Sequence, residues 1–145
     1  MELTDIVARS WGWTGIQPLE VVSENDFGNL IVRDVQDQYW RVCPEDLYCK
    51  IVATDRTALD ALRKDQEFQQ DWNMDPLVEE ARTNVGSLER GRKYCLKIPG
   101  LLGGAYAGHN LASISLIELI QSSGDVAFQL KDLPEGSQVQ FRIGE

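Results

Sequence analysis

Hydrophobic and polar positions alternate with a period of two over the first third of the chain and with a period near 3.6 over the middle. A short amphipathic stretch at residues 3–9 is followed by four segments rich in β-branched and aromatic side chains, separated by short polar links. Short links favour antiparallel neighbours. The pattern therefore predicts a helix and then a meander of strands at residues 19–23, 30–33, 39–43 and 47–53, with one apolar face and the other wet or covered by helices.

From Thr57 onward the apolar positions take helical spacing. Asp75 and Pro76 form a good N-cap and first-turn pair, and Gly86 can end the helix that they begin. We expect two or three consecutive helices packed on the sheet, with their acidic faces outward. Their inward sides are formed by Leu59, Leu62, Phe68, Trp72, Leu77, Val78, Ala81 and Val85.

The last third contains two more strand patterns and one helix start. Residues 92–98 alternate as a strand does, and Ser115 with Glu118 makes a capping box in front of an apolar run. We expect Gly124 to end that helix and residues 125–131 to form a second short one. A turn at residues 134–136 then precedes a final half-buried strand, with Val139, Phe141 and Ile143 on one side.

This order of elements predicts an α+β fold, a largely antiparallel sheet covered by helices. A chain of 145 residues fits a single compact domain over 1–145, with the β-meander at about 14–54 and a helical and C-terminal part at about 55–145. The residues after Met1 carry the wrong charge for a secretory leader, and no apolar run approaches the ~18 residues of a membrane span. We expect a cytoplasmic protein that does not contact a membrane.

The residue inventory argues against an enzyme. The chain has one histidine, His109, and three cysteines without a metal-ligand spacing, Cys43, Cys49 and Cys95. Buried free thiols are the simplest interpretation. The alternatives, a Cys/His nucleophile or a Cys/His zinc site, need residues from distant segments to converge. We expect no catalytic residues, no metal and no cofactor.

Charge is the next constraint. A formal net charge of −9 argues against direct nucleic-acid binding, which needs clustered Lys and Arg. Residues 55–80 hold eight acidic and three basic side chains and are the most acidic part of the chain. This stretch is either a solvated helical face that confers solubility or a patch that steers a cationic protein surface into contact.

The glycine-rich loop at residues 99–108 raises the possibility of a phosphate-cradling site. It lacks both the following Lys with Ser or Thr of a P-loop and the GxGxxG spacing. A structural or partner-contacting turn is the alternative.

Two further groups of residues have a structural and a functional interpretation. The four tryptophans, at 11, 13, 40 and 72, are either core side chains or the walls of a ligand cleft. The adjacent acids at 45 and 46 and at 79 and 80 could suggest a hydrolytic pair, but neighbouring side chains point apart, which favours solvated charges.

The chain resembles the bacterial family of the C-terminal domain of type VI secretion immunity proteins, most closely from about Asp71 onward. The best anchors are its Leu-Gly-Gly and Ser-x-x-Glu-Leu segments. The resemblance is carried by Trp11, Gly12, Trp13, Asn25, Phe27, Gly28, Asn29, Tyr39, Trp40, Arg41, Pro44, Glu45, Asp71, Trp72, Met74, Tyr94, Ile98, Pro99, Gly100, Leu102, Gly103, Gly104, Tyr106, Asn110, Ser115, Glu118, Leu119, Ser123, Gly124, Asp132, Leu133, Pro134 and Gly136.

The resemblance implies an immunity protein that neutralises a cognate toxin, a Tde-type DNase effector in the named members, by binding and occluding it. The partner expected is a toxin with a basic surface. A regulatory protein-interaction module and a small-molecule-binding or hydrolytic protein remain as alternatives. The candidate contacts are the helical acids Asp65, Glu67, Asp71, Asp75 and Glu79. The glycine loop, with Gly103, Gly104 and Tyr106, is a second possibility.

Overall fold

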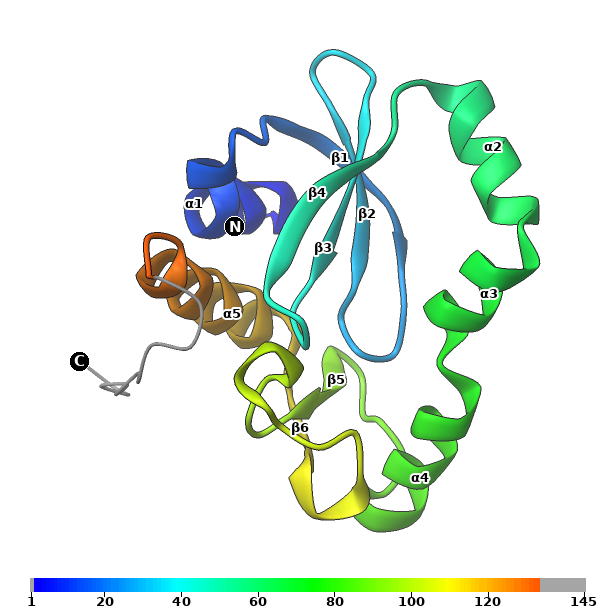
Figure 1. The fold of residues 1–145 in the computed structure, drawn as a ribbon, viewed down its shortest axis with the longest axis vertical. Helices are drawn as coiled ribbons and strands as arrows, with labels where there is room; N and C mark the ends of the chain where they lie inside the picture. Colours follow the sequence, from blue (N-terminus) through cyan, green and yellow to red (C-terminus); the bar gives the residue numbers. More distant parts are fainter. Residues whose placement is uncertain (1, 134–145) are drawn as a thin grey trace.

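A four-stranded meander stands at the centre of the computed structural model, which describes residues 2–133 (Figure 1). Its strands are ordered β1-β2-β3-β4, and every neighbouring pair is antiparallel, as predicted. A second sheet pairs β5 with β6, also antiparallel. The elements are α1 (Leu3–Trp11), β1 (Pro18–Glu24), β2 (Leu30–Asp34), β3 (Tyr39–Cys43), β4 (Tyr48–Ala53), α2 (Arg56–Lys64), α3 (Gln66–Asn73), α4 (Asp75–Val85), β5 (Arg92–Leu96), β6 (Leu111–Ser115) and α5 (Leu116–Leu130), with 3₁₀ turns at Gly12–Thr14, Gly100–Leu102 and Gly108–Asn110.

Both faces of the meander are covered, because side chains on successive strand positions point to opposite sides. Leu30 and Val32 of β2 pack toward α1 and α5, whereas Ile31 between them packs toward α2 and α3. In Figure 1, α1 and α5 lie on one side of the sheet and the α2–α4 segment curves around the other. The sequence predicted that the second face of the sheet is exposed to water or covered by helices. Helices cover it.

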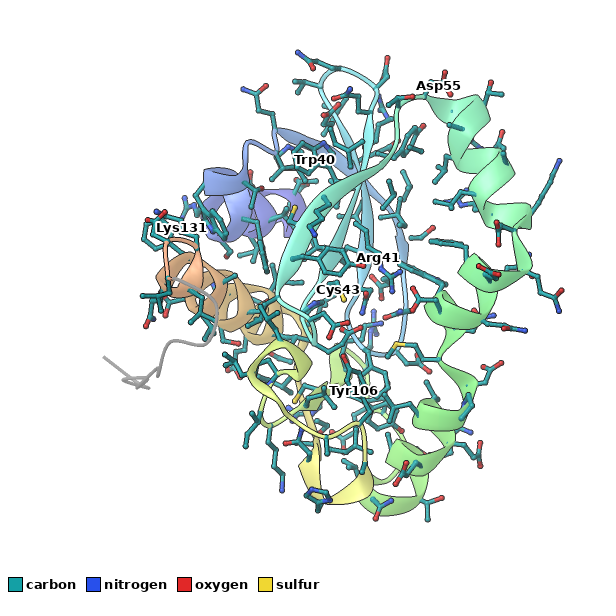
Figure 2. The ribbon with its side chains drawn as sticks, in the orientation of Figure 1. Trp40, Arg41, Cys43, Asp55, Tyr106 and Lys131 are labelled. Atoms are coloured by element: carbon teal, nitrogen blue, oxygen red, sulfur yellow. The ribbon has the colours of Figure 1, made fainter. Side chains whose placement is uncertain are left out.

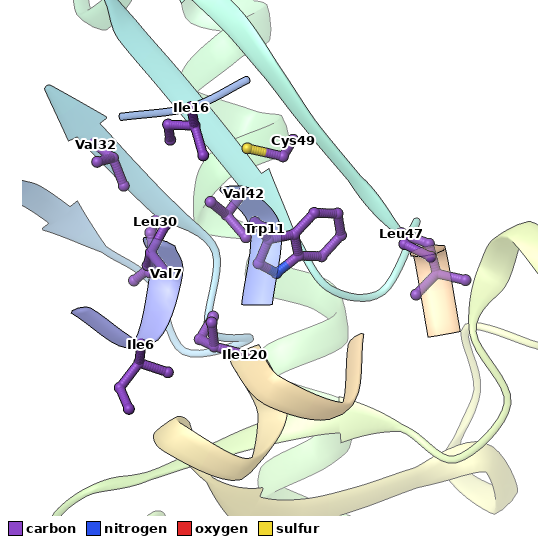
Figure 3. Close-up of a cluster of buried hydrophobic side chains, with 11 residues drawn as sticks. Ile6, Val7, Trp11, Ile16, Leu30, Val32, Val42, Leu47, Cys49 and Ile120 are labelled. Carbon is purple, nitrogen blue, oxygen red and sulfur yellow. The ribbon is translucent and has the colours of Figure 1, made fainter. Parts of the chain in front are cut away.

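The face under α1 and α5 is an apolar core. Trp11 from α1 and Ile120 from α5 are fully buried against Leu30, Val32 and Val42 of the sheet (Figure 3). Burial of such side chains contributes about 1.5–3 kcal/mol each relative to exposure. This cluster explains why α1 and α5, far apart in sequence, pack side by side.

The helical segment contains three helices, the larger of the two numbers that the sequence predicts. Asp65 has an extended backbone and its carboxylate accepts hydrogen bonds from the amides of Glu67 and Phe68, so it caps a new helix, α3. The acidic side chains of this segment face outward, as expected. An N-cap aspartate therefore stops α2 within a continuous helical pattern.

The predicted N-cap at Asp75 is wrong by one residue. Met74 takes the cap position with a left-handed φ of +52°, and Asp75 is the first residue of α4. The side chain of Asn25, in the β1–β2 turn, donates to the carbonyl of Trp72 at 2.8 Å. This tertiary contact holds the α3–α4 junction against the sheet and favours the tight bend.

Gly124 does not end the last helix, which runs on to Leu130 and absorbs the second short helix expected after it. A Cβ atom at Gly124 would lie 2.4 Å from the carbonyl oxygen of Ser10 in α1. The glycine is therefore explained by the close approach of two helix backbones. It permits helix packing and does not mark a helix end.

Other predicted features keep their place or fall outside the described residues. Ser115 caps α5 as the capping box predicts, by accepting from the amide of Glu118 at 3.1 Å. The strand expected at residues 139–143 lies outside the described residues. Within residues 2–133, no helix is both long enough and apolar enough to cross a membrane.

Candidate partner-binding site

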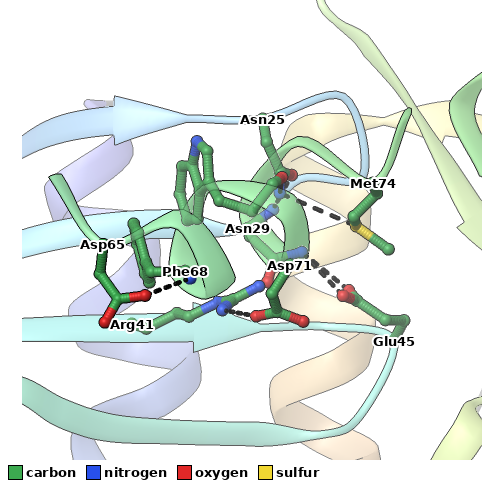
Figure 4. Close-up of polar contacts among 9 residues, drawn as sticks. Asn25, Asn29, Arg41, Glu45, Asp65, Phe68, Asp71 and Met74 are labelled. Carbon is green, nitrogen blue, oxygen red and sulfur yellow. Dashed lines mark hydrogen bonds and ion pairs between the residues drawn. The ribbon is translucent and has the colours of Figure 1, made fainter. Parts of the chain in front are cut away.

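Arg41 is a buried charge at the centre of the sheet face that α3 covers. Its Nε donates to Oδ1 of Asn29 at 3.0 Å, and its Nη1 donates to Oδ2 of Asp71 in α3 at 2.5 Å (Figure 4). The guanidinium also lies 5.3 Å from the ring centre of Trp72, a cation–π distance. Burial disfavours the charged form, but the hydrogen bond to Asp71 and the charge interactions with Tyr48, Cys43 and Asp71 together outweigh it, so the pKa of Arg41 lies above its ordinary value. One arginine thus attaches α3 to β3.

Glu45 extends this buried network into the β3–β4 turn. Both of its carboxylate oxygens accept from Nδ2 of Asn29, at 3.0 and 2.8 Å, so the Asn29 amide bridges Arg41 and Glu45. Burial raises the pKa of Glu45 above its ordinary value, against the opposing effect of these hydrogen bonds. The side chains of Glu45 and Arg41 are thus both hydrogen-bonded to the side-chain amide of Asn29, below α3.

The donor atoms of Cys43, Glu45 and Asp46 lie within 4.8 Å of one another, the one such group of potential metal ligands in residues 2–133. These donors already have internal roles. Asn29 occupies the Glu45 oxygens, the Tyr106 hydroxyl donates to Asp46, and burial raises the pKa of the Cys43 thiol, which favours its protonated form. The arrangement is better suited to a hydrogen-bond network than to a cation.

The three cysteines are free. Cys43 and Cys49 are buried, as the sequence suggests, and burial raises the pKa of Cys49 to about 11. Cys95 is only half-buried, which departs from that expectation. His109 is exposed in its 3₁₀ turn.

The backbone amides of the glycine loop donate hydrogen bonds to carbonyls within the protein. The amides of Gly100, Gly103 and Gly104 donate to the carbonyls of Glu45, Gly100 and Pro99. A Cβ at Gly104 would lie 1.7 Å from the carbonyl oxygen of Ile98, so the loop closes on itself too tightly for any other residue. These amides are unavailable to a phosphate group, which disfavours the phosphate-binding alternative.

The same loop is fixed to the helices and to the β3–β4 turn. The amide of Gly108 donates to Oε1 of Glu80 in α4 at 2.9 Å, and the Tyr106 hydroxyl donates to Asp46. Asn110 is buried and holds the loop from inside, donating to the carbonyls of Ile98 and Ala105. Figure 2 shows Tyr106 between the glycine loop and the helical segment.

These contacts leave a shallow cleft of about 380 Å³ between α3–α4 and the loop. Its apolar side chains are Met74, Pro76 and Leu77, and Asp71 and Glu80 supply two carboxylates. Tyr106 closes the side opposite the helices and remains 46% exposed. An aromatic edge, an apolar floor and a carboxylate rim together suit a lysine or arginine side chain of a protein partner.

The family model for the type VI secretion immunity protein Tdi1, C-terminal region, matches residues 53–126, just over half of the chain. The chain belongs to this family. The matched residues run from the end of β4 into α5 and include every side chain of the cleft. They exclude Asn29, Arg41 and Glu45, which support the cleft from below.

No curated protein matches the chain. The fold is similar to the crystal structure of Atu4351 from Agrobacterium tumefaciens, with a TM-score of 0.52 and 14% sequence identity. The similarity covers 83% of this chain but only 62% of that one. At this identity the likeness concerns the fold alone.

The structure brings two of the predicted contact residues together and separates the others. Asp71 and Tyr106, from the two surfaces named as alternatives, line the same cleft. Asp65 and Glu67 lie at the opposite end of α3, where Asp65 is a helix cap. The remaining four do not line the cleft: Asp75 in the first turn of α4, Glu79 paired with Arg82, and Gly103 and Gly104 within the loop backbone.

Sequence reasoning missed Arg41 and Glu80. Arg41 lies in a strand pattern, where a single charge between Trp40 and Val42 is the signal that a buried partner is needed. Glu80 was among the counted acids of the helical segment, but its bond to Gly108 depends on a loop 28 residues away. No local pattern predicts that contact.

Proposed function

We propose that this protein is an immunity protein that binds and neutralises a cognate toxin, a secreted DNase effector, and that it does so without catalysis of its own. The observation that carries the proposal is the carboxylate-rimmed cleft between α3–α4 and the glycine loop, within the family-matched residues. A DNase must present basic side chains to bind phosphates. An acidic surface that occupies those side chains blocks the DNA site by occlusion.

The charge distribution supports this choice of surface. Asp75 and Glu79 do not line the cleft but are exposed on the same helix, α4, so they add negative charge to the surface near it. Exposed charges of this kind act mainly on the association rate and on its salt dependence. The apolar floor and Tyr106 would supply the desolvated centre of the interface.

The test is a titration of the purified chain with the toxin encoded beside its gene, followed by a nuclease assay. Asp75→Lys/Glu79→Lys should weaken binding at least tenfold at low salt and flatten its salt dependence, since two attractive charges become repulsive. Excess duplex DNA should compete with the wild-type chain for the toxin, as expected for occlusion of the DNA site.

The matched control is Glu20→Lys/Asp37→Lys. It makes the same charge change at two exposed carboxylates, one on β1 and one in the β2–β3 turn, that both pair with Arg33 of β2. It should retain wild-type affinity. Equal weakening by both double variants would show that only net charge matters and would remove the α3–α4 assignment. A stable chain that neither binds nor protects would overturn the proposed function itself.

A further inference from the structure

Two carboxylates of the cleft between α3–α4 and the glycine loop each use one oxygen in a hydrogen bond within the protein. Oδ2 of Asp71 accepts from Nη1 of Arg41 at 2.5 Å, and Oε1 of Glu80 accepts from the amide of Gly108 at 2.9 Å. Within residues 2–133, Oδ1 of Asp71 and Oε2 of Glu80 accept no hydrogen bond. Each carboxylate is therefore oriented by the protein and keeps a second oxygen for a donor from outside the chain.

The two carboxylates differ in how far a basic side chain already balances their charge. Asp71 forms an ion pair with buried Arg41, whereas Glu80 forms no ion pair in the part of the chain that the structure describes. A cation that enters the cleft therefore gains most of its electrostatic attraction from Glu80. Asp71 mainly contributes an acceptor atom at a fixed position.

The rest of the cleft suits the aliphatic part of one long side chain. Met74 and Leu77 line it with apolar groups, and Tyr106 lines it with an aromatic ring whose hydroxyl is held by Asp46. The volume of about 380 Å³ lies near the low end of small-ligand sites, about 300–1,000 Å³. A cleft of this size has room for a single side chain of a partner and not for a whole helix.

Arginine matches these features better than lysine does. A guanidinium carries its N–H donors in one plane, so it can bond to acceptors on two sides while it lies against an aromatic ring. An ammonium ion is compact and strongly hydrated, so it loses more hydration on entering a cleft with apolar walls. The chain uses the same chemistry internally, since Arg41 bonds to Asp71 and lies 5.3 Å from the ring centre of Trp72.

We propose that one arginine of the toxin enters this cleft and bonds to the remaining oxygens of Glu80 and Asp71. Its aliphatic carbons pack on Leu77, and its guanidinium lies beside Tyr106. This occupant rests on the proposed function, since it is a side chain of the same toxin. Glu80 then slows dissociation of the complex, whereas exposed Glu79, next to it in sequence but outside the cleft, affects only association.

The first measurement is the dissociation rate of the complex between the full-length chain and the toxin encoded beside its gene. Glu80→Gln should raise this rate about tenfold, because the arginine loses the carboxylate that no other cation balances. Asp71→Asn should raise it about threefold, since Arg41 already balances part of that charge. Glu79→Gln, the matched control, should leave it unchanged. Equal dissociation rates for Glu80→Gln and Glu79→Gln would overturn the proposal.

The glutamine variant is chosen because it keeps the glycine loop in place. Its side-chain oxygen can still accept from the amide of Gly108, so slow exchange of that amide in Glu80→Gln shows that the cleft is intact. If the amide exchanges faster than in the wild type, Asp71→Asn replaces Glu80→Gln in the second measurement.

The second measurement changes the toxin. Each surface arginine of the toxin is replaced by lysine in turn, and dissociation is measured from the wild-type chain and from Glu80→Gln. One replacement should raise the rate about tenfold with the wild-type chain and less than about twofold with Glu80→Gln, the non-additivity expected of two residues in contact. A complex in which no arginine, or only a lysine, is coupled to Glu80 would overturn this occupant and leave the proposed function standing. Absence of any complex with the wild-type chain would overturn both.

Discussion

The two faces of the central meander both bury apolar side chains but differ in the polar groups that they bury with them. Under α1 and α5 the contacts are apolar, to the point that the indole Nε1 of buried Trp11 has no hydrogen-bond partner among the described residues. Under α2 and α3 an apolar cluster around Ile31 and Leu59 lies beside a buried polar network. In that network Arg41, Asn29 and Glu45 are connected, and Arg41 reaches the exposed carboxylate of Asp71. The apolar face holds the fold together, and the polar face sets the position of the helix that lines the cleft.

The difference lies in what each contact specifies. Apolar burial is strong but weakly directional, so α1 and α5 need only matching shapes. A buried guanidinium needs partners at fixed positions, because an unpaired buried charge is costly. The Arg41 network therefore determines where Asp71 lies, at the cost of a desolvated charge.

The largest expected effect is on the apolar face. Ile120→Ala removes a fully buried side chain and should lower the free energy of unfolding by about 2–5 kcal/mol, since a cavity is added to the lost burial. Denaturant unfolding measures this. Ile117→Ala on the exposed side of the same helix is the control and should change stability little; equal losses would show that α5 is not held by this core.

The polar face should respond less in stability and more in position. Arg41→Met leaves Asn29 and Glu45 without their charged partner and should cost about 2–3 kcal/mol, within the range for hydrogen bonds to charged groups. Amide exchange should then increase in α3, which loses its bond to the sheet. Arg33→Met, at an exposed pair on β2, is the matched control; unchanged α3 exchange in Arg41→Met would refute the anchoring role.

The smallest effect concerns pH. Burial raises the pKa of Glu45 above 4.5, so between 4.5 and the raised value the folded state binds more protons than the unfolded state. Stability from this group is therefore present below pH 4.5 and declines as the pH rises through that window. Glu45→Gln should remove this decline in unfolding curves recorded at several pH values, whereas exposed Glu89→Gln should keep it. A decline of the same size in Glu45→Gln would assign the pH dependence to other groups.

Much of the fold was predictable because its local signals agree. Alternating Val, Ile and aromatic residues predicted the four strands of the meander, and Ser115 with Glu118 predicted the start of α5. The errors occurred where a tertiary contact changes the meaning of a residue. Gly124 is a residue type typical of a helix end, but here it allows α5 to pack closely against α1. The local pattern predicts Asp75 as the N-cap of α4, whereas Met74 occupies that position.

The same division applies to the candidate site. The acidic character of residues 55–80 and the glycine-rich loop could be predicted from the sequence, because charge and glycine content do not depend on the fold. That Asp71 and Tyr106 share one cleft was decided by the tertiary structure, through Arg41 beneath α3 and Asp46 beneath the loop. Hydrogen bonds between residues 30 and 60 positions apart depend on chain packing, and no local periodicity encodes them.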